Sequence, residues 1–370
     1  MSNALAQPGF PASFTEARDA WLAAVAARGG SVDSMRHPGH GPEGEALWMD
    51  AARFGAPAAS KVFVVACGTH GIEGYAGSAV QTAWLAQGGP GALPEDVAVL
   101  LIHAINPWGF AHRQRVNEDN VDLNRNFRAH GETPPPANPG YAELHPQLYL
   151  NDWTEAEIAQ AFAAMDAFRA RVGEQGFSDA FNGGQYSHAD GIFHGGDRPA
   201  WSNLAVRALL RRQLHAAREC LFADLHTGIG PYGQPFLINV DPPGSEARER
   251  AIAVWGAEAL SGKGSTHQAL ATFQGLLLDA FATELPDCRV SAVAIEFGTH
   301  ERRRMQRAHL TLMWLRRQAV ETPVTEMARE DYVEAFIPSD PAWRAAVMES
   351  GVALCRKGLR AVVDGTGARA

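Results

Sequence analysis

Two histidines and two carboxylates stand at positions where this chain of 370 residues could perform chemistry. His70 and Glu73 lie in GTHGIEGYAG, directly after the apolar run KVFVVAC, His226 lies in DLHTG, and Glu296 ends the run VSAVAIEF. Two histidines and one carboxylate can form a three-ligand zinc site with an open position for water, and a second carboxylate can accept the proton of that water. The residue types therefore predict one zinc ion per chain, held by His70, Glu73 and His226.

Each of these residues also has an ordinary explanation when it is considered alone. A single His-x-x-Glu occurs often by chance in a turn with solvated side chains, and a histidine such as His226 is frequently a hydrogen-bonded residue at a strand end. Glu296 is harder to explain in this way, because a carboxylate at the end of so apolar a strand is costly to bury unless it is paired or used.

The elements that must position these residues are strands that alternate with helices. Such alternation predicts an α/β fold with a mixed, mostly parallel sheet flanked by helices. Ligands bind outside the carboxyl ends of the strands in open α/β sheets, so residues far apart in sequence are expected to meet there. The predicted strands are 61–67, 97–104, 219–225, 235–240 and 290–297, and the predicted helices are 75–87, 154–172, 200–218, 245–260 and 301–319, besides an opening helix after the capping box of Ser13 and Glu16.

The most specific stretch is RVNEDNVDLNRNF, residues 115–127, which follows INPWGFAHR. With it, the sequence resembles the zinc carboxypeptidase (carboxypeptidase A-like) metallopeptidase family and the related succinylglutamate desuccinylase and aspartoacylase group. The resemblance extends from about residue 61 to residue 300 and excludes 128–200. The matching pieces are His70-x-x-Glu73, Asn106-Pro-x-Gly109, Arg115 ten residues before Arg125, Asp122-Leu-Asn124-Arg125-Asn126-Phe127, Asp224-Leu-His226 and Ile-Glu296-Phe-Gly298.

The resemblance implies a role for each matching residue at the reacting centre. His70, Glu73 and His226 would bind zinc. Glu296 would be the general base for the attacking water, and Arg115 would stabilise the developing oxyanion. The residue types agree, since zinc lowers the pKa of a bound water to about 7 and a carboxylate can accept its proton.

The resemblance also implies how the substrate is held. Asn124 and Arg125 would bind a substrate carboxylate, which a guanidinium can meet with two parallel hydrogen bonds. Asp122 would orient His70. The alternative for Arg125 is a structural salt bridge with a neighbour such as Asp119 or Asp122.

The sequence departs from the carboxypeptidase pattern at one point. Carboxypeptidases of this family usually carry a tyrosine some twenty residues before the catalytic glutamate, but no tyrosine occurs between Tyr232 and Tyr332. Tyr186 or Tyr232 could replace it from another loop. DLHTG is also closer to the amidohydrolase branch, whose members release an acyl group from an amino acid.

These observations predict a zinc-dependent hydrolase that cleaves an amide bond adjacent to a free carboxylate, in the manner of a metallocarboxypeptidase. The alternative is an N-acyl-amino-acid deacylase similar to aspartoacylase, and a third hypothesis is a catalytically silent protein that binds peptides or amino acids. The expected partner is a small peptide or N-acyl amino acid. The sequence does not predict the side chain or acyl group recognised, or the oligomeric state.

Composition excludes several other classes of protein. A net charge of −9, with basic clustering only in ERRRMQR at 301–307, argues against a nucleic-acid surface. No run of 18 apolar residues and no signal peptide are visible, so a cytoplasmic protein without a membrane segment is expected. The four cysteines are isolated, which favours buried thiols over disulfides.

The chain is expected to form a single zinc-carboxypeptidase-like domain over 1–370, in which 128–200 is a loop-rich insertion beside the site. Long loops inside a compact domain are usually functional. His188 and His194 in this region could line the site or bind a second metal. Ser78 is expected inside a helix rather than at a nucleophile elbow. Structural or solvent-facing roles are expected for His103, His267 and His300.

Overall fold

A seven-stranded mixed sheet forms the centre of the molecule in the computed structural model, which describes residues 9–131, 134–260 and 270–366. The strand order is β1-β2-β4-β3-β5-β7-β6. Strands β1, β4, β3, β5 and β7 run in one direction and β2 and β6 in the other, so the expected α/β fold with a mixed, mostly parallel sheet is confirmed. The strands are β1 (Ser31–His40), β2 (Ala46–Gly55), β3 (Lys61–Cys67), β4 (Val97–His103), β5 (Glu219–Gly228), β6 (Pro235–Ile238) and β7 (Arg289–Gly298).

The central strands are the ones that the sequence predicts. In β3 and β4 almost every residue is buried, because helices cover both faces of the sheet, and strands of this kind consist of continuous apolar runs. All five predicted strands are present. The largest differences are that β5 continues to Gly228 and that β6 already ends at Ile238.

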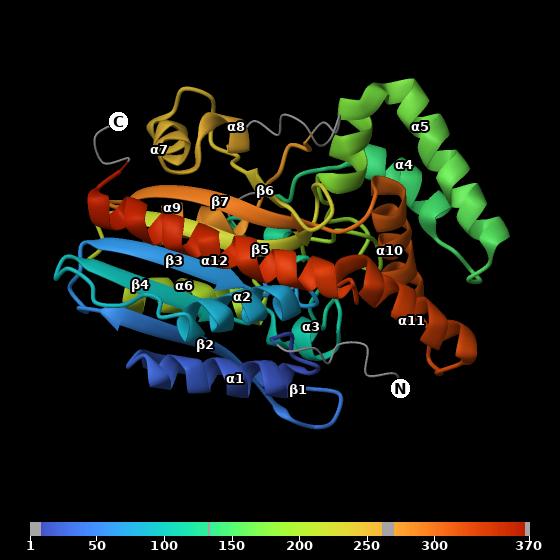
Figure 1. Cartoon of the computed structure of the whole chain (residues 1–370). Coiled ribbons are helices and arrows are strands. Elements are labelled where there is room, and N and C mark those ends of the chain that lie inside the picture. The colour runs from blue at the N-terminus through green and yellow to red at the C-terminus, as the bar shows by residue number, and fades with distance from the viewer. Residues whose placement is uncertain (1–8, 132–133, 261–269, 367–370) are drawn as a thin grey trace.

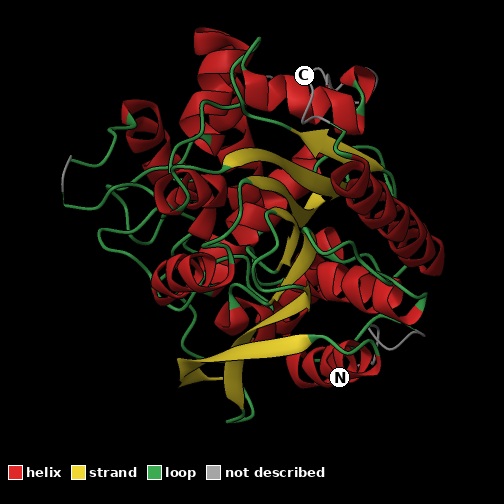
Figure 2. Ribbon diagram, turned by 90° about the vertical axis from the view of Figure 1, so that its left-hand side faces the viewer, coloured by secondary structure: helices red, strands yellow, loops and turns green. Residues whose placement is uncertain are grey.

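Helices cover both faces of the sheet (Figures 1 and 2). Helices α1 (Phe14–Ala27), α2 (Gly74–Ala86) and α12 (Pro341–Asp364) pack on one face. The other face carries α6 (Trp201–Gln213) and α9 (Leu277–Glu284). Each face therefore has its own apolar core, and the two cores fix the sheet and its carboxyl edge.

A third apolar cluster lies beside the sheet, at the right of Figure 1. It joins α4 (Pro139–Leu148) and α5 (Glu155–Asn182) to α10 (Arg302–Leu315), with α11 (Pro323–Phe336) packed against α10. Within the segment 128–200, α5 contains the predicted helix 154–172, and α4 is a helix where only loop was expected, because apolar side chains of both helices are buried against α10.

Several elements were not predicted from the sequence. Strands β1 and β2 and helices α9, α11 and α12 are among them, as is α4, which contains Pro146. The remaining short elements are α3 (Pro107–Ala111), the 3₁₀ helix η1 (Leu123–Arg125), α7 (Glu246–Trp255) and α8 (Ala257–Leu260). Among the described residues, no helix is both long enough and apolar enough to span a membrane. All four cysteines are free thiols, as expected.

Candidate metal centre and substrate cavity

The loop between β3 and α2 carries His70 and Glu73 and is held rigidly against the segment that carries Arg115. The backbone N–H groups of Gly71 and Ile72 donate to the carbonyls of Arg115 and Gln114 (3.1 and 2.9 Å). A Cβ at Gly71 would lie 2.1 Å from the carbonyl carbon of Gly109, so only glycine permits this close approach. The glycine-rich sequence therefore positions His70 and Glu73 through backbone packing.

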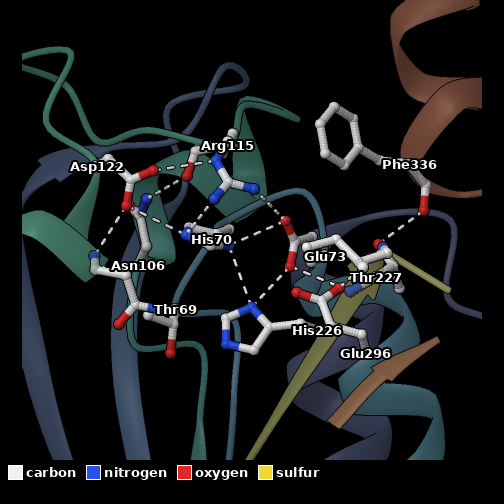
Figure 3. A network of polar contacts seen from close by, with 12 residues as sticks. Thr69, His70, Glu73, Asn106, Arg115, Asp122, His226, Thr227, Glu296 and Phe336 are labelled. Atoms are coloured by element: carbon white, nitrogen blue, oxygen red, sulfur yellow. Dashed lines mark hydrogen bonds and ion pairs between the residues drawn. The ribbon is translucent and has the colours of Figure 1, made fainter. Parts of the chain in front are cut away.

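His70, Glu73 and His226 converge at the carboxyl edge of the sheet and are all buried (Figure 3). The Nδ1 atoms of the two histidines are 3.2 Å apart. The Glu73 carboxylate oxygens lie 3.0 Å from Nδ1 of His70 and 2.9 Å from Nδ1 of His226. A tetrahedral ion with bonds of about 2.0–2.1 Å holds its ligand atoms roughly 3.3 Å apart. One ligand atom from each of the three residues lies within 4.8 Å of the others, which is close enough for the set to hold one zinc ion after small shifts.

The opposite nitrogens of both rings contact carboxylates. Nε2 of His226 donates to Asp224 (2.7 Å), which leaves its Nδ1 able to act as a ligand. Nε2 of His70 lies 3.2 Å from Asp122 and 2.8 Å from Nη2 of Arg115, so it either donates to the carboxylate or accepts from the guanidinium. In the tautomer that donates to Asp122, both Nδ1 lone pairs face the same point. Carboxylates behind ligating histidines are common at metal sites, because they fix the tautomer.

The electrostatics of the cluster also favour a cation between the three side chains. Burial alone would raise the pKa of the Glu73 carboxyl, but His70, His226 and Arg115 outweigh it and hold that pKa well below its ordinary value. Burial would lower the pKa of His226, but Asp224 and Glu73 raise it well above the ordinary value. The carboxylates that attract a proton to His226 would equally attract a metal ion to this position.

Glu296 and Arg115 flank the three candidate ligands. Glu296 is paired in register with His226 in the β5–β7 ladder, and Figure 3 shows its carboxylate beside Glu73. Burial raises the pKa of Glu296, which makes it a better proton acceptor near neutral pH than an exposed glutamate. The guanidinium of Arg115 donates to Glu73 (2.8 Å) and Asp122 (3.1 Å), so its charge is compensated inside the protein.

Asn124 and Arg125 lie in η1, which Asp122 caps by accepting from the backbone N–H of Asn124 (2.9 Å). The Arg125 guanidinium is buried and donates to the carbonyls of Asn124 (2.8 Å) and Asn182 (2.6 Å). Its Nε has no hydrogen-bond partner. Among the described residues, no carboxylate forms an ion pair with Arg125, so the alternative of a structural salt bridge with Asp119 or Asp122 is not borne out.

One cavity of about 740 Å³ is lined by residues from the candidate metal site and from η1. Its lining includes His70, His226 and Glu296, here called the metal end, and Asn124 and Arg125, here called the Arg125 end. Its remaining wall is largely apolar, with Phe222, Ile238, Val240, Leu277, Ala292 and Ala294 among its members. The cavity therefore joins a candidate metal site to a buried cation across an apolar surface.

The two tyrosines that could replace the missing one have different positions. Tyr186 does not line this cavity, and its hydroxyl donates to the carbonyl of Arg125 (2.6 Å). Tyr232 lines the cavity but is 46% exposed and its hydroxyl contacts Asp340 (3.2 Å). The buried Tyr332 accepts from the backbone N–H of Arg115 (2.9 Å) and so holds the segment of that arginine.

Two residues of the site had no role assigned from the sequence. Asp224, which accepts from His226, stands in the matching motif Asp224-Leu-His226 without a role of its own. His309 lines the cavity from α10 and was not singled out at all. Asp224 could have been found from its position two residues before a candidate ligand, whereas nothing in the sequence near His309 indicates that α10 reaches the site.

The histidines of the 181–199 loop lie away from the candidate ligands. His188 stacks on His145 with ring centroids 4.0 Å apart, and Asp190 lies 3.2 Å from His145. These three residues form a second group with metal-ligand chemistry. Because nitrogen lone pairs lie in the plane of their own ring, two stacked rings cannot both point at one ion unless one of them turns. His194 is buried, and its carbonyl accepts from the backbone N–H of Asp122 (2.8 Å).

The other expectations have mixed outcomes. Ser78 lies inside α2, as expected, and its hydroxyl is 2.9 Å from Nε2 of the buried His103 in the core. His300 lines the cavity, and its Nε2 lies 3.2 Å from the carbonyl of Glu334. His267 lies outside the described residues.

A sequence profile of one protein family, described as "Protein of unknown function (DUF2817)", matches residues 10–350. A search of curated proteins finds no match.

Solved structures with a similar fold include members of the groups that the motifs resemble. Thrombin activatable fibrinolysis inhibitor is 13% identical, with 95% of this chain and 74% of that chain covered and a TM-score of 0.48. A metallo-carboxypeptidase from Burkholderia cenocepacia is 15% identical (92% and 68% covered, TM-score 0.42). A protein from Shewanella amazonensis, provisionally assigned to the succinylglutamate desuccinylase/aspartoacylase family, is 19% identical (76% and 72% covered, TM-score 0.36). Because these TM-scores are below 0.5, function is inferred from the side chains of the site.

Proposed function

The chain belongs to the DUF2817 family, whose description assigns no activity, and we propose that it is a zinc-dependent hydrolase that cleaves an amide bond next to a free carboxylate. The observation that carries this proposal is the single cavity that joins the His70, Glu73 and His226 cluster to Glu296 and to the guanidinium of Arg125. A binding protein would need the cation but has no evident use for a buried base beside three metal ligands.

The residues at the metal end have distinct roles in this proposal. His70, Glu73 and His226 hold the zinc ion, which when bound supplies Lewis acidity and a nucleophilic water at neutral pH. Glu296 accepts the proton of the attacking water, and its raised pKa suits that step. Arg115 donates to the oxygen on which negative charge develops, in the manner of an oxyanion hole.

The other end of the cavity binds the substrate carboxylate. Arg115 pairs with Glu73 and Asp122, and Arg302 pairs with Glu174 (2.8 Å). Arg125 is therefore the one arginine lining the cavity, within the described residues, that lacks a carboxylate partner. A buried cation is costly unless it is paired, so a substrate anion would relieve that cost.

This count of charges favours a carboxypeptidase-like activity over removal of an acidic acyl group. A succinyl or aspartyl substrate would bring a second carboxylate into the cavity, for which the described lining offers no second unpaired arginine. The largely apolar wall of the cavity instead suits an apolar side chain on the residue that carries the carboxylate. Deacylation of N-acyl amino acids with uncharged acyl groups remains the alternative within the same chemistry.

Turnover of a substrate panel tests the proposal. The panel contains short peptides and N-acyl amino acids with apolar or acidic groups, each measured with and without a chelator. We expect hydrolysis of substrates with a free carboxylate and an apolar side chain, loss of hydrolysis with the chelator, and recovery on addition of zinc. Binding without turnover of any member would support a silent binding protein instead.

A further inference from the structure

His309 is a residue of the cavity for which the proposed function gives no role. It lies on α10, and its ring is surrounded by aromatic side chains: the ring centroids of Phe193, Phe336 and Phe181 are 4.7, 5.8 and 6.4 Å away. The ring is partly exposed, and it lines the cavity together with His70 and Arg115. A phenylalanine would fill an aromatic enclosure of this kind as well as a histidine does.

The ring nitrogens distinguish this histidine from a packing residue. Neither ring nitrogen of His309 has a hydrogen-bond partner among the described residues. His40, His188 and His194 share this property, but of these four only His309 lines the cavity. Burial lowers the pKa of His309 to about 3, so the ring is neutral at physiological pH and offers one donor and one acceptor. Neither nitrogen is among the buried atoms without a partner, and the ring lines the cavity, so a ligand bound there can be its partner.

Its neighbours place His309 near the metal end of the cavity. Apart from burial, the groups that act most strongly on His309 are Arg115, Asp122, Glu73 and His70. The ring of Phe193, which packs on His309, lies under the guanidinium of Arg115 at 5.2 Å and under that of Arg125 at 5.4 Å, so of the two arginines only the electrostatic influence singles out Arg115. The backbone carbonyl of Phe336, another neighbour of His309, accepts from Thr227 Oγ1 (2.8 Å; Figure 3), and Thr227 directly follows the candidate ligand His226.

Phe193 itself is held in an unusual conformation. Its φ of 53° lies in the left-handed region, which a bulky residue seldom adopts. Backbone strain of this kind is concentrated at functional sites, where the surrounding structure maintains it. Here the strained residue places an aromatic ring against both His309 and the arginines of the cavity.

We propose that His309 is a substrate-binding residue that hydrogen-bonds an amide group in the acyl part of the substrate, on the side of the scissile bond away from the carboxylate. This inference rests on the proposed function, since it assumes that Arg125 binds the substrate carboxylate and that Arg115 lies beside the scissile carbonyl. A neutral imidazole matches an amide, which offers one acceptor and one donor, and the surrounding aromatic rings suit a planar group. The preferred substrates are then peptides with an upstream amide bond.

Two compounds of equal chain length separate this role from packing. N-acetylglycyl-phenylalanine and N-pentanoyl-phenylalanine share the scissile amide and the free carboxylate, but only the first has an upstream amide. Binding of both is measured by calorimetry to zinc-loaded protein carrying Glu296→Gln, which is not turned over, and to the same protein with His309→Phe or His309→Gln added. The phenylalanine variant keeps the aromatic packing, and the glutamine variant keeps a donor and an acceptor.

We expect the Glu296→Gln protein to prefer the upstream amide by roughly three- to tenfold, the factor that one neutral hydrogen bond provides. His309→Phe should remove that preference, and His309→Gln should keep part of it. An unchanged preference in His309→Phe, or the absence of any preference before mutation, would overturn the role of His309. If the preference behaves as expected but wild-type protein hydrolyses neither compound, the role of His309 stands and the proposed hydrolase activity falls. If neither compound binds at all, both are refuted.

Discussion

The two ends of the cavity differ in how their buried charges are balanced. At the metal end, Glu73 and Asp122 contact Arg115 and His70, and Asp224 contacts His226, so the groups around the candidate ligands have opposite charges within the protein. Glu296, the candidate base, accepts only from the backbone N–H of Ile229 (3.3 Å) among the contacts of the described residues. At the Arg125 end, the guanidinium of Arg125 contacts carbonyl oxygens and the faces of aromatic rings, and Asp122 acts on it electrostatically without forming an ion pair.

This difference separates what the protein completes by itself from what a ligand must complete. A buried network with paired charges is rigid and holds its geometry without substrate. A buried cation without an anion is a cost to the folded protein that persists where function requires it. In the proposed function, the metal end is therefore preorganised for chemistry, and the Arg125 end would receive an anion.

The largest expected effect of a single substitution is on the chemical step. Glu296→Gln removes the proton acceptor while keeping the size of the side chain, so kcat/KM should fall by roughly a thousandfold. Zinc content and the melting temperature should stay close to those of the wild type. Glu349→Gln, at an exposed position of α12, is the matched control and should leave turnover unchanged. Wild-type rates in Glu296→Gln would rule out Glu296 as the base.

Replacing each arginine by methionine compares the two ends directly. Arg115→Met leaves Glu73 and Asp122 buried without their partner, and we expect the free energy of unfolding of the metal-free protein to fall by about 3–5 kcal/mol. Arg125→Met removes a cation without a carboxylate partner, so the free energy of unfolding should change by no more than about 1 kcal/mol or should increase. Urea titrations of both variants measure these values. A large loss of stability in Arg125→Met would mean that Arg125 has a structural role.

The selectivity for a free carboxylate tests the Arg125 end. Wild-type enzyme should hydrolyse a peptide acid much faster than its C-terminal amide, because only the carboxylate pairs with the guanidinium. Arg125→Ala should lower kcat/KM for the acid by roughly a hundredfold and cleave both forms at similar, low rates. Equal cleavage of acid and amide by the wild type would contradict the assignment.

A smaller effect, on zinc affinity, is expected when the carboxylate that contacts the candidate ligand His226 is replaced. Asp224→Asn replaces the carboxylate that accepts from Nε2 of His226, and its zinc affinity should be about 10- to 100-fold weaker. Competition with a chromophoric chelator measures this affinity. Asp190→Asn, in the separate group around His145, is the control and should bind zinc at this centre as the wild type does. An unchanged affinity in Asp224→Asn would mean that the carboxylate does not support the ligand.

The sequence predicts the centre of the sheet better than its edge. β3 and β4 are continuous apolar runs, which is the pattern of strands buried on both faces. β1 has the sequence SVDSMRHPGH and is largely exposed, so it shows no apolar run, and its proline and glycine argue against a strand. Pairing with β2 at the sheet edge nevertheless makes it one.

In the candidate site, too, some residues can be predicted from the sequence and others cannot. His70, Glu73, His226 and Glu296 follow or end predicted strands, so the rule that strand ends converge is sufficient to bring them together. The position of His309 depends on how α10 packs against α4 and α5, and no local pattern encodes that packing. The missing ion-pair partner of Arg125 is likewise a property of tertiary structure.

The zinc content of three purified proteins tests the central assignment most directly. We predict one zinc per chain in the wild type and in His145→Ala, a histidine variant at the other candidate group, and none in His226→Ala, measured by mass spectrometry of the metal after dialysis. Because the ligands lie on a large apolar core, all three proteins should be folded by circular dichroism. Full zinc occupancy in His226→Ala, or its loss in His145→Ala alone, would contradict the site described here.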